Sequence, residues 1–125
     1  MKTIFVLCGL CLAGAVAWVV FERPWADHHG GPFRGLPAVG MAELLARPGD
    51  YLKKEVRLEG RVRRECPCCG CWIVLGDPAG RELRVESGDT VGHLPYRLGK
   101  HAIVEGELIR YGEGYELIGA AVEFR

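Results

Sequence analysis

The chain has 125 residues, of which 49% are apolar and 26% charged, which is the length and composition of one globular domain preceded by an apolar segment. Its 16 basic and 16 acidic residues balance, so composition excludes a protein that binds nucleic acid through bulk basic charge and one with an acidic tail. The sequence also lacks a Ser/His/Asp set, paired carboxylates and a phosphate-binding loop, so we expect a non-enzymatic protein.

The first feature along the chain is an uncharged apolar run over residues 4–21. As an α-helix this run would span roughly 27 Å, close to the hydrocarbon thickness of a bilayer. Lys2 precedes the run, and a positive charge at this end favours an amino terminus on the inside of the membrane. The run therefore predicts a transmembrane anchor or signal helix at 1–21, with the rest of the chain exported.

Two forms of export remain open. An uncleaved anchor explains why residues 18–21 stay apolar, and it would place a single-pass protein in the bacterial inner membrane with its carboxyl-terminal domain in the periplasm or outside. A signal peptide would instead be cleaved near Ala17, after the small residues of Ala15-Val16-Ala17, and would give a secreted protein. Both forms predict an oxidising compartment that permits disulfides.

Residues 22–40 contain four Gly and three Pro and show no hydrophobic period. This composition predicts an extended tether rather than folded structure. His28 and His29 within it are metal-ligand types, although a solvated pair is the simpler interpretation. The next stretch, 41–46, is made of good helix formers and is stopped by Arg47 and Pro48, which predicts a short helix.

From residue 51 the hydrophobic period becomes two, which is typical of strands. Val56, Leu58 and Val62 alternate with charged residues, and Gly60 between them predicts a bulge or a sharp bend. Four more strands are expected, at 72–75, 81–86, 100–111 and 115–124, with a long connector at 87–99. The order of three strands, a connector and two strands predicts an all-β, five-stranded OB-fold-like closed barrel over 41–125, with one short helix at its amino terminus.

The turn between the first two expected strands holds four of the six cysteines: Cys66, Cys68, Cys69 and Cys71. Cys66 and Cys71 end facing strands, so a disulfide between them is one interpretation. Capture of a soft metal, Cu(I) or Zn(II), is a second, because thiolates select these ions. Thiol–disulfide exchange is a third, although the motifs of such enzymes start a helix, whereas a strand follows here.

Basic and aromatic residues surround this turn. Arg61, Arg63 and Arg64 are expected to lower the pKa values of the thiols, and they form with Trp72 the candidate binding residues beside the cysteines. Trp72 itself is interpreted first as a packing aromatic of the barrel. His93 and His101 lie at the ends of the connector as further candidate ligands, although solvated histidines are the simpler interpretation.

OB-folds also bind single-stranded nucleic acid through aromatic and basic residues on this part of the sheet. Here Glu59 interrupts the basic stripe of Arg57, Arg61 and Arg63, and no aromatic residue alternates with it. Export would also remove the usual partner, so nucleic-acid binding ranks third among the functions.

The pattern Val56-x-Leu58-x-Gly60-x-Val62, followed by Cys66 and then Gly70-Cys71-Trp72, resembles a small, largely uncharacterised bacterial family of exported OB-fold proteins. The stretch Pro-Gly-Asp-Tyr-Leu-Lys-Lys at 48–54 also resembles the lead-in of anticodon-binding-like OB domains. The resemblance covers roughly residues 41–124 and implies an exported OB-fold. This chain departs from the family pattern by adding Cys68 and Cys69 between the two family cysteines.

The sequence thus predicts an OB-fold binding module outside the cytoplasm, tethered by residues 4–21, whose cysteine-rich hairpin binds copper or zinc or is redox-active. The alternative is a non-enzymatic interaction domain of an envelope complex, with another envelope protein as partner and a structural Cys66–Cys71 disulfide. Thiol counting with and without a reductant and a chelator separates the two.

Overall fold

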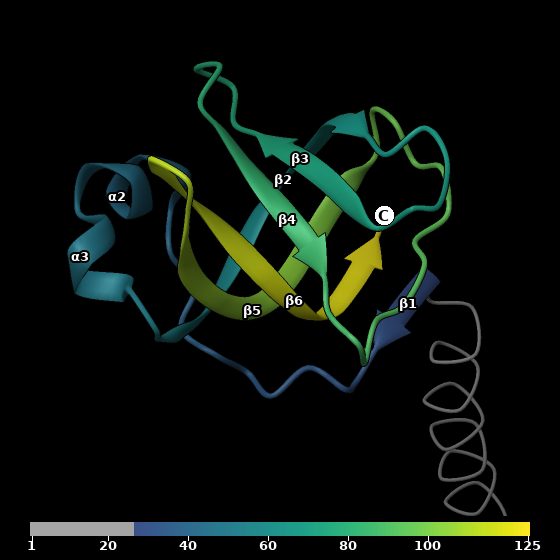
Figure 1. Cartoon of the computed structure of the whole chain (residues 1–125), viewed down its shortest axis with the longest axis horizontal. Coiled ribbons are helices and arrows are strands. Elements are labelled where there is room, and N and C mark those ends of the chain that lie inside the picture. Colours follow the sequence, from purple (N-terminus) through teal and green to yellow (C-terminus); the bar gives the residue numbers. More distant parts are fainter. Residues whose placement is uncertain (1–26) are drawn as a thin grey trace, which may run out of the picture.

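The computed structural model describes residues 27–125, which form a small closed β-barrel with two short helices at one end (Figure 1). The predicted membrane segment at 4–21 lies outside the described residues. Within residues 27–125, no helix is long and apolar enough to cross a membrane. The strands are β1 (Asp27–Gly30), β2 (Glu55–Glu65), β3 (Trp72–Gly76), β4 (Glu82–Ser87), β5 (His101–Tyr111) and β6 (Gly114–Phe124).

Strands β2 to β6 form the closed barrel that the sequence predicts, and the fold is an OB-fold. The sheet order is β1-β6-β4-β3-β2-β5, and an additional pairing between β5 and β6 closes it. All pairings are antiparallel except β4 with β6, which is parallel. That parallel pairing requires the connector between β4 and β5, which crosses the end of the barrel. Residues 88–100 of this connector contain no helix or strand.

The alternation of β2 places Val56, Leu58 and Val62 in the core, where each is at most 3% exposed. The strand is long enough to pair with β5 through its first half and with β3 through its second. Its register is irregular between Val62 and Arg64, two positions beyond Gly60, where the sequence predicts the bulge. Gly60 instead allows a close approach of two strands, because a Cβ there would lie 2.9 Å from the carbonyl oxygen of Gly76.

The predicted helix is present as α2 (Met41–Ala46), and it closes one end of the barrel. Met41 and Leu44 are 4% and 0% exposed and belong to the core cluster. A second helical turn that the sequence does not predict, α3 (Pro48–Tyr51), follows it. Pro48 at its first turn suits a helix start, and Tyr51 is consequently helical rather than the first residue of the strand pattern.

The predicted tether at 22–40 is wrong for the part of it that the structure describes. Residues 27–30 form β1, which pairs with the end of β6, and residues after β1 run along the barrel wall. Val39 donates its N–H to the carbonyl oxygen of Arg57, and the N–H of Arg57 returns a bond to Pro37. We call residues 27–39 the arm. The Gly and Pro content that suggests a tether serves here to let the chain follow a curved surface without regular structure.

Glu105 on β5 holds the arm in place. Its side chain is only 1% exposed, and its two carboxylate oxygens accept the N–H groups of Arg34 and Leu36 at 2.7 and 2.9 Å. A buried carboxylate is stable only when it is hydrogen-bonded in this way. The arm therefore belongs to the folded domain, which begins at residue 27 or earlier rather than at 41.

Replacing Glu105 by alanine should release the arm. Hydrogen bonds to a charged group are worth about 1.5–3 kcal/mol each, so we expect the free energy of unfolding to fall by about 3 kcal/mol. Urea denaturation of the Glu105→Ala protein measures this loss. Glu107→Ala, two residues further along the same strand, is the matched control and should change stability by less than about 1 kcal/mol. Equal losses in both variants would contradict this role for Glu105.

Candidate metal centre

The cysteine-rich turn, residues 66–71, connects the end of β2 to the start of β3. Cys66 follows β2 directly and donates its N–H to the carbonyl oxygen of Trp72, the first residue of β3. This cross-strand bond closes the turn, so the intervening residues must fold back over a short distance. The sulfur atoms of the four cysteines are brought together as a result.

The sulfurs of Cys66 and Cys69 each lie close to all three others. Cys66 lies 3.6 Å from the sulfurs of Cys68 and Cys69 and 3.5 Å from that of Cys71. Cys69 is 2.8 Å from Cys71 and 3.6 Å from Cys68. The sulfurs of Cys66, Cys69 and Cys71 all lie within 4.8 Å of one another and could together hold a metal ion. Cys68 adds a fourth sulfur next to two of these three.

The four thiols differ in exposure. Cys66 is 3% exposed, Cys71 is half-buried, and Cys68 and Cys69 are exposed. A metal ion held by this cluster would thus have protein on the side of Cys66 and solvent on the side of Cys68 and Cys69. The arrangement is a site at the surface of the barrel, not within its core.

Backbone amides make Cys66 the most acidic thiol of the cluster. The N–H groups of Cys69, Cys68 and Cys71 donate hydrogen bonds to its sulfur and lower its pKa from the usual 9.0 to about 5. Hydrogen bonds to the charged form stabilise a thiolate in the same way as they stabilise a carboxylate. Cys66 is therefore ionised at neutral pH, and ionised thiols are the form that binds metals.

The other thiols respond to this charge. Hydrogen bonding with Cys69 and Cys66 raises the pKa of Cys71 to about 12, and hydrogen bonding with Cys66 and Cys69 also raises the pKa of Cys68. Several thiolates at 3–4 Å repel one another, so the cluster cannot ionise fully without a counter-charge. A bound cation supplies that charge, so metal binding would release the remaining protons.

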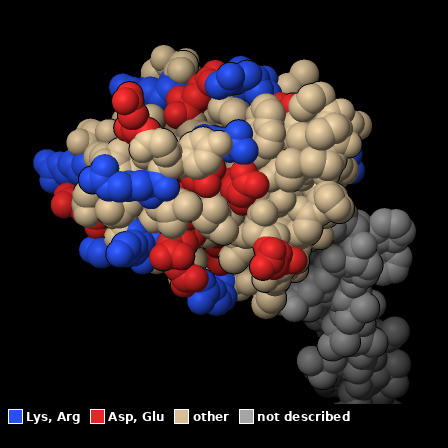
Figure 2. Space-filling model, in the orientation of Figure 1, with Lys and Arg blue, Asp and Glu red and all other residues tan. Residues whose placement is uncertain are grey.

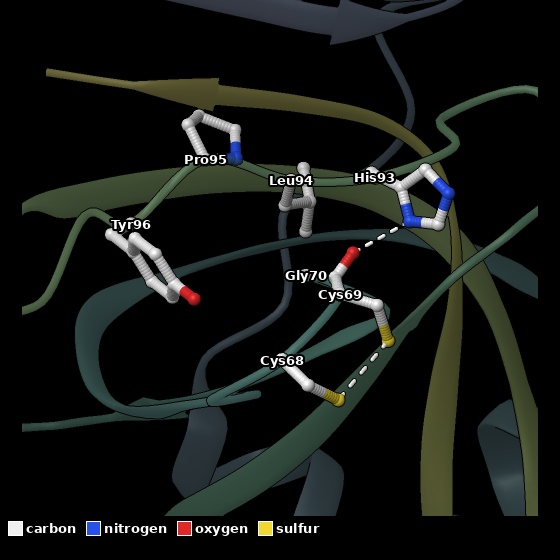
Figure 3. Close-up of a pocket in the computed structure, with 7 residues that line it drawn as sticks. All are labelled: Cys68, Cys69, Gly70, His93, Leu94, Pro95 and Tyr96. Atoms are coloured by element: carbon white, nitrogen blue, oxygen red, sulfur yellow. Dashed lines mark hydrogen bonds between the residues drawn. The ribbon is translucent and has the colours of Figure 1, made fainter.

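While the amide groups of the turn face inward, its carbonyl groups face the connector between β4 and β5. Figure 3 shows the middle of this contact, where His93 approaches the carbonyl of Cys69. The bonds are Tyr96 Oη to Pro67 O at 2.8 Å, His93 Nδ1 to Cys69 O at 2.5 Å, Leu94 N to Gly70 O at 2.8 Å and Ser87 N to Cys71 O at 2.9 Å. The turn is thereby held with its amides aimed at sulfur.

Gly70 is the residue at which the turn and the connector come closest. Its φ is +65°, and a Cβ there would lie 2.0 Å from the carbonyl oxygen of Leu94. Only glycine combines this left-handed conformation with such a close approach. The position thus couples the turn to the connector through the chain itself.

The arginines that the sequence predicts to lower the thiol pKa values are engaged elsewhere. Arg61 donates to the carbonyl oxygen of Gly99, and Arg64 pairs with Glu82. The side chain of Arg63 lies against Gly76. The predicted cause of the low thiol pKa is therefore wrong: backbone amides supply the stabilisation, and the sequence pattern does not reveal where amides point.

Trp72 lies on the outer side of β3, because its neighbour Ile73 points into the core. It does not pack in the barrel interior. Its ring instead makes a cation–π contact with the guanidinium of Arg84, which lies 5.0 Å from the ring centre. The predicted binding residues therefore do not form one site with the cysteines.

The four histidines of the chain have different surroundings. His93 lies beside the cysteine turn, whereas His101 lies 3.7 Å from Glu59 on the other side of β2. His28 bonds the carbonyl oxygen of Gly31 and the carboxylate of Glu123. His29 bonds Asp27, so neither histidine of the pair is a free metal ligand.

No disulfide joins the cysteines of the described chain, and all four are free thiols. The Cys66–Cys71 bridge that the sequence offers as an alternative is not formed, since the two sulfurs lie 3.5 Å apart, against about 2.05 Å in a disulfide. Three of the four sulfurs, those of Cys66, Cys69 and Cys71, share a centre that could hold a metal ion.

The low pKa of Cys66 predicts how the metal-free, reduced protein titrates. Its thiolate should persist on acidification to about pH 5 and then be lost. Between pH 5 and 9 the unfolded chain binds the extra proton, so this thiol makes stability rise with pH across that window and lose its contribution below it. Thiolate ultraviolet absorbance measures the transition. Cys66→Ser should lack it, and a single transition of all thiols near pH 9 would contradict the assignment.

Apart from His93, the residues of the connector are those that the sequence does not associate with the cysteines. Leu94 and Tyr96 lie more than twenty positions from the turn and carry no motif. Pro95 and Gly92 identify the segment only as a loop. The connector lies over the turn because β4 pairs with β6. This pairing is a property of the closed barrel, and no local sequence pattern indicates it.

The chain matches no family model, and no curated protein matches it. Among solved structures it is similar to the hypothetical protein ygiW from E. coli, with 12% identity, a TM-score of 0.55 and coverage of 76% of this chain and 99% of that one. It is also similar to a putative aspartyl-tRNA synthetase from Leishmania major Friedlin, with 16% identity and a TM-score of 0.53 over 76% of this chain. It spans only 23% of the synthetase. At these identities the likeness establishes the fold alone, and the chain is an OB-fold protein with a cysteine cluster at one end of its barrel.

Proposed function

We propose that the protein is an exported, membrane-tethered OB-fold module that binds one soft metal ion through its cysteine turn. The observation that carries the proposal is the convergence of three sulfurs, Cys66, Cys69 and Cys71, within 4.8 Å of one another. One of these thiols is held as a thiolate by three backbone amides. A pre-ionised thiolate with two further cysteine sulfurs close to it is a site prepared for a cation.

The ligand set favours Cu(I), with Zn(II) as the second candidate. Thiolate ligands select both ions, and three mutually close sulfurs suit a three-coordinate Cu(I). A tetrahedral Zn(II) with four Zn–S bonds of about 2.3 Å would separate its sulfurs by about 3.8 Å. Four of the sulfur separations are 3.5–3.6 Å, but Cys69 and Cys71, at 2.8 Å, would have to move apart by about 1 Å to reach that geometry.

The alternative is an interaction domain in which the cysteines serve only to staple the turn. The free thiols and their inward-pointing amides support metal capture over this alternative. An oxidising compartment would nonetheless close a bridge between any two of these sulfurs unless a metal or a reductant protected them.

Anaerobic titration of the reduced, full-length chain with Cu(I) and, separately, with Zn(II) tests the proposal. We expect one ion retained per chain after dialysis, with the thiols of Cys66, Cys69 and Cys71 protected from alkylation. Removal of the ion by a chelator should restore their reactivity. Retention of neither ion, with a bridge between two of these cysteines after exposure to air, would favour the interaction domain.

A further inference from the structure

The exposure of the cysteine cluster is one-sided. Cys66 is buried at its base, whereas Cys68 and Cys69 are exposed at its rim. The backbone of the turn is fixed by three hydrogen bonds to the connector and one to Ser87 at the end of β4, so the buried side cannot open without breaking them. A metal ion bound here would be approached, and would leave, only past the two exposed sulfurs.

These two sulfurs border an open depression of about 380 Å³ between the turn and the connector. Figure 3 shows the connector along one wall, with the side chains of His93 and Tyr96 on either side of Leu94 and Pro95. None of the lining residues is Asp, Glu, Lys or Arg; they are Cys68, Cys69, Gly70, His93, Leu94, Pro95 and Tyr96. An uncharged hollow beside thiol ligands suits an uncharged, soft side chain better than an ionic one.

Apolar surface continues beyond the hollow. Within residues 27–125 three large hydrophobic side chains are exposed, and two of them, Tyr96 and Leu98, lie on this connector at 61% and 62% exposure. In Figure 2 charged side chains of both signs crowd one half of the visible face, and the half nearer the connector and the cysteine turn is mostly uncharged. Exposed apolar surface around a polar site is typical of a protein-binding surface.

We propose that this exchange face, comprising Cys68, Cys69, His93, Tyr96 and Leu98, docks a partner protein that presents a cysteine or methionine on an apolar surface, and that the metal passes between the two by ligand exchange. The inference rests on the proposed function, since it concerns the same metal. It adds that the site is built for transfer and not for permanent retention.

The exchange conserves charge and electrons. An incoming thiol forms one metal–sulfur bond as it gives up its proton, the bond from Cys69, the exposed member of the group of three, to the metal breaks, and the released thiolate takes up a proton. The oxidation state of the metal does not change. Cys66 keeps its bond through this step, because its sulfur is buried and is held by three amides.

The order of the release reaction tests the exchange. The full-length chain in nonionic detergent is loaded with Cu(I) and mixed anaerobically with rising concentrations of 2-mercaptoethanol or of the apolar peptide N-acetyl-Leu-Cys-Phe-amide. We expect the rate of Cu(I) loss to rise in proportion to thiol concentration. A rate independent of thiol concentration would overturn the inference, because the metal would then leave before the thiol arrives.

A pair of variants tests the docking surface. Leu98→Glu should slow release to the apolar peptide several-fold and leave release to 2-mercaptoethanol unchanged. Tyr111→Glu, at the third exposed hydrophobic position and distant from the turn in sequence, is the matched control and should affect neither rate. Unchanged peptide rates in Leu98→Glu would overturn the docking surface.

The test separates this inference from the proposed function. A chain that retains neither Cu(I) nor Zn(II) contradicts the proposed function. A chain that holds Cu(I) and releases it at a rate independent of thiol concentration contradicts only the inference, and so does a chain that retains Zn(II) alone.

Discussion

Replacing Cys66 by serine is expected to weaken metal binding by at least about 100-fold. Loss of a residue that merely orients a ligand already costs about 10–100-fold, and Cys66 is itself a ligand. Its sulfur, like that of Cys69, lies within 3.6 Å of all three others, and it is the thiolate that the amides stabilise. Competition titration with a chromophoric chelator measures the affinity.

Cys68→Ser is the matched control for this prediction. It removes an exposed sulfur that stands outside the group of three, so the affinity should fall by less than about 10-fold for a three-coordinate ion. Circular dichroism before metal addition checks that both variants fold. Equal losses in the two variants would contradict the larger role of Cys66 as a ligand, and a large loss for Cys68→Ser with Zn(II) alone would indicate a four-coordinate site.

Replacing Gly70 by alanine is expected to lower the free energy of unfolding by about 2–3 kcal/mol and to weaken metal binding with it. About 1–2 kcal/mol arises from the left-handed backbone conformation. The rest arises because the new Cβ would overlap the carbonyl oxygen of Leu94, which separates the turn from the connector and breaks the bond from Leu94 N–H to Gly70.

Gly80→Ala provides the comparison, because Gly80 also has a positive φ, +86°, with nothing within 4 Å of the added carbon. It should show the conformational cost alone, about 1–2 kcal/mol, and unchanged metal affinity. Thermal unfolding and metal titration of both variants give the two measurements. Normal affinity in Gly70→Ala would show that the connector does not shape the cysteine turn.

Much of the barrel can be predicted from the sequence, because apolar residues alternate with polar ones along its strands. The run Val56, Leu58, Val62 predicts the core of β2 without reference to any other element. The order of strands and connector then suffices for the OB-fold, which the pairing of β5 with β6 closes. Local periodicity carries this information because a half-buried strand imposes it residue by residue.

The packing of the arm onto the barrel could not be predicted from the sequence, for a physical reason. Residues 31–39 form no strand, and besides a few backbone bonds near its ends this stretch is held by a distant carboxylate, Glu105, which accepts two of its N–H groups. A glutamate within a strand reads as an outward, solvated side chain, so its burial depends on the segment that covers it. No local pattern records such a mutual dependence.

The cysteine cluster is intermediate between these cases. The spacing of the cysteines predicts that their sulfurs approach one another, but the amides that ionise Cys66 and the connector that orients them depend on backbone direction and on the closed barrel. The sequence therefore indicates the ligands and misassigns their electrostatic support to arginines.

The folding of the arm onto the barrel also limits how far the domain can lie from the proposed membrane anchor. If residues 4–21 are the anchor that we propose, five residues, 22–26, separate that anchor from Asp27, the start of β1. Even fully extended they reach at most about 18 Å. Asp27 also pairs with Arg97 of the connector, so the end of the barrel that carries the cysteine turn lies close to the start of this short linker. A receiver of the metal would then have to be embedded in, or resting on, the same lipid bilayer, since a freely diffusing protein would meet this end only in the narrow gap above the headgroups.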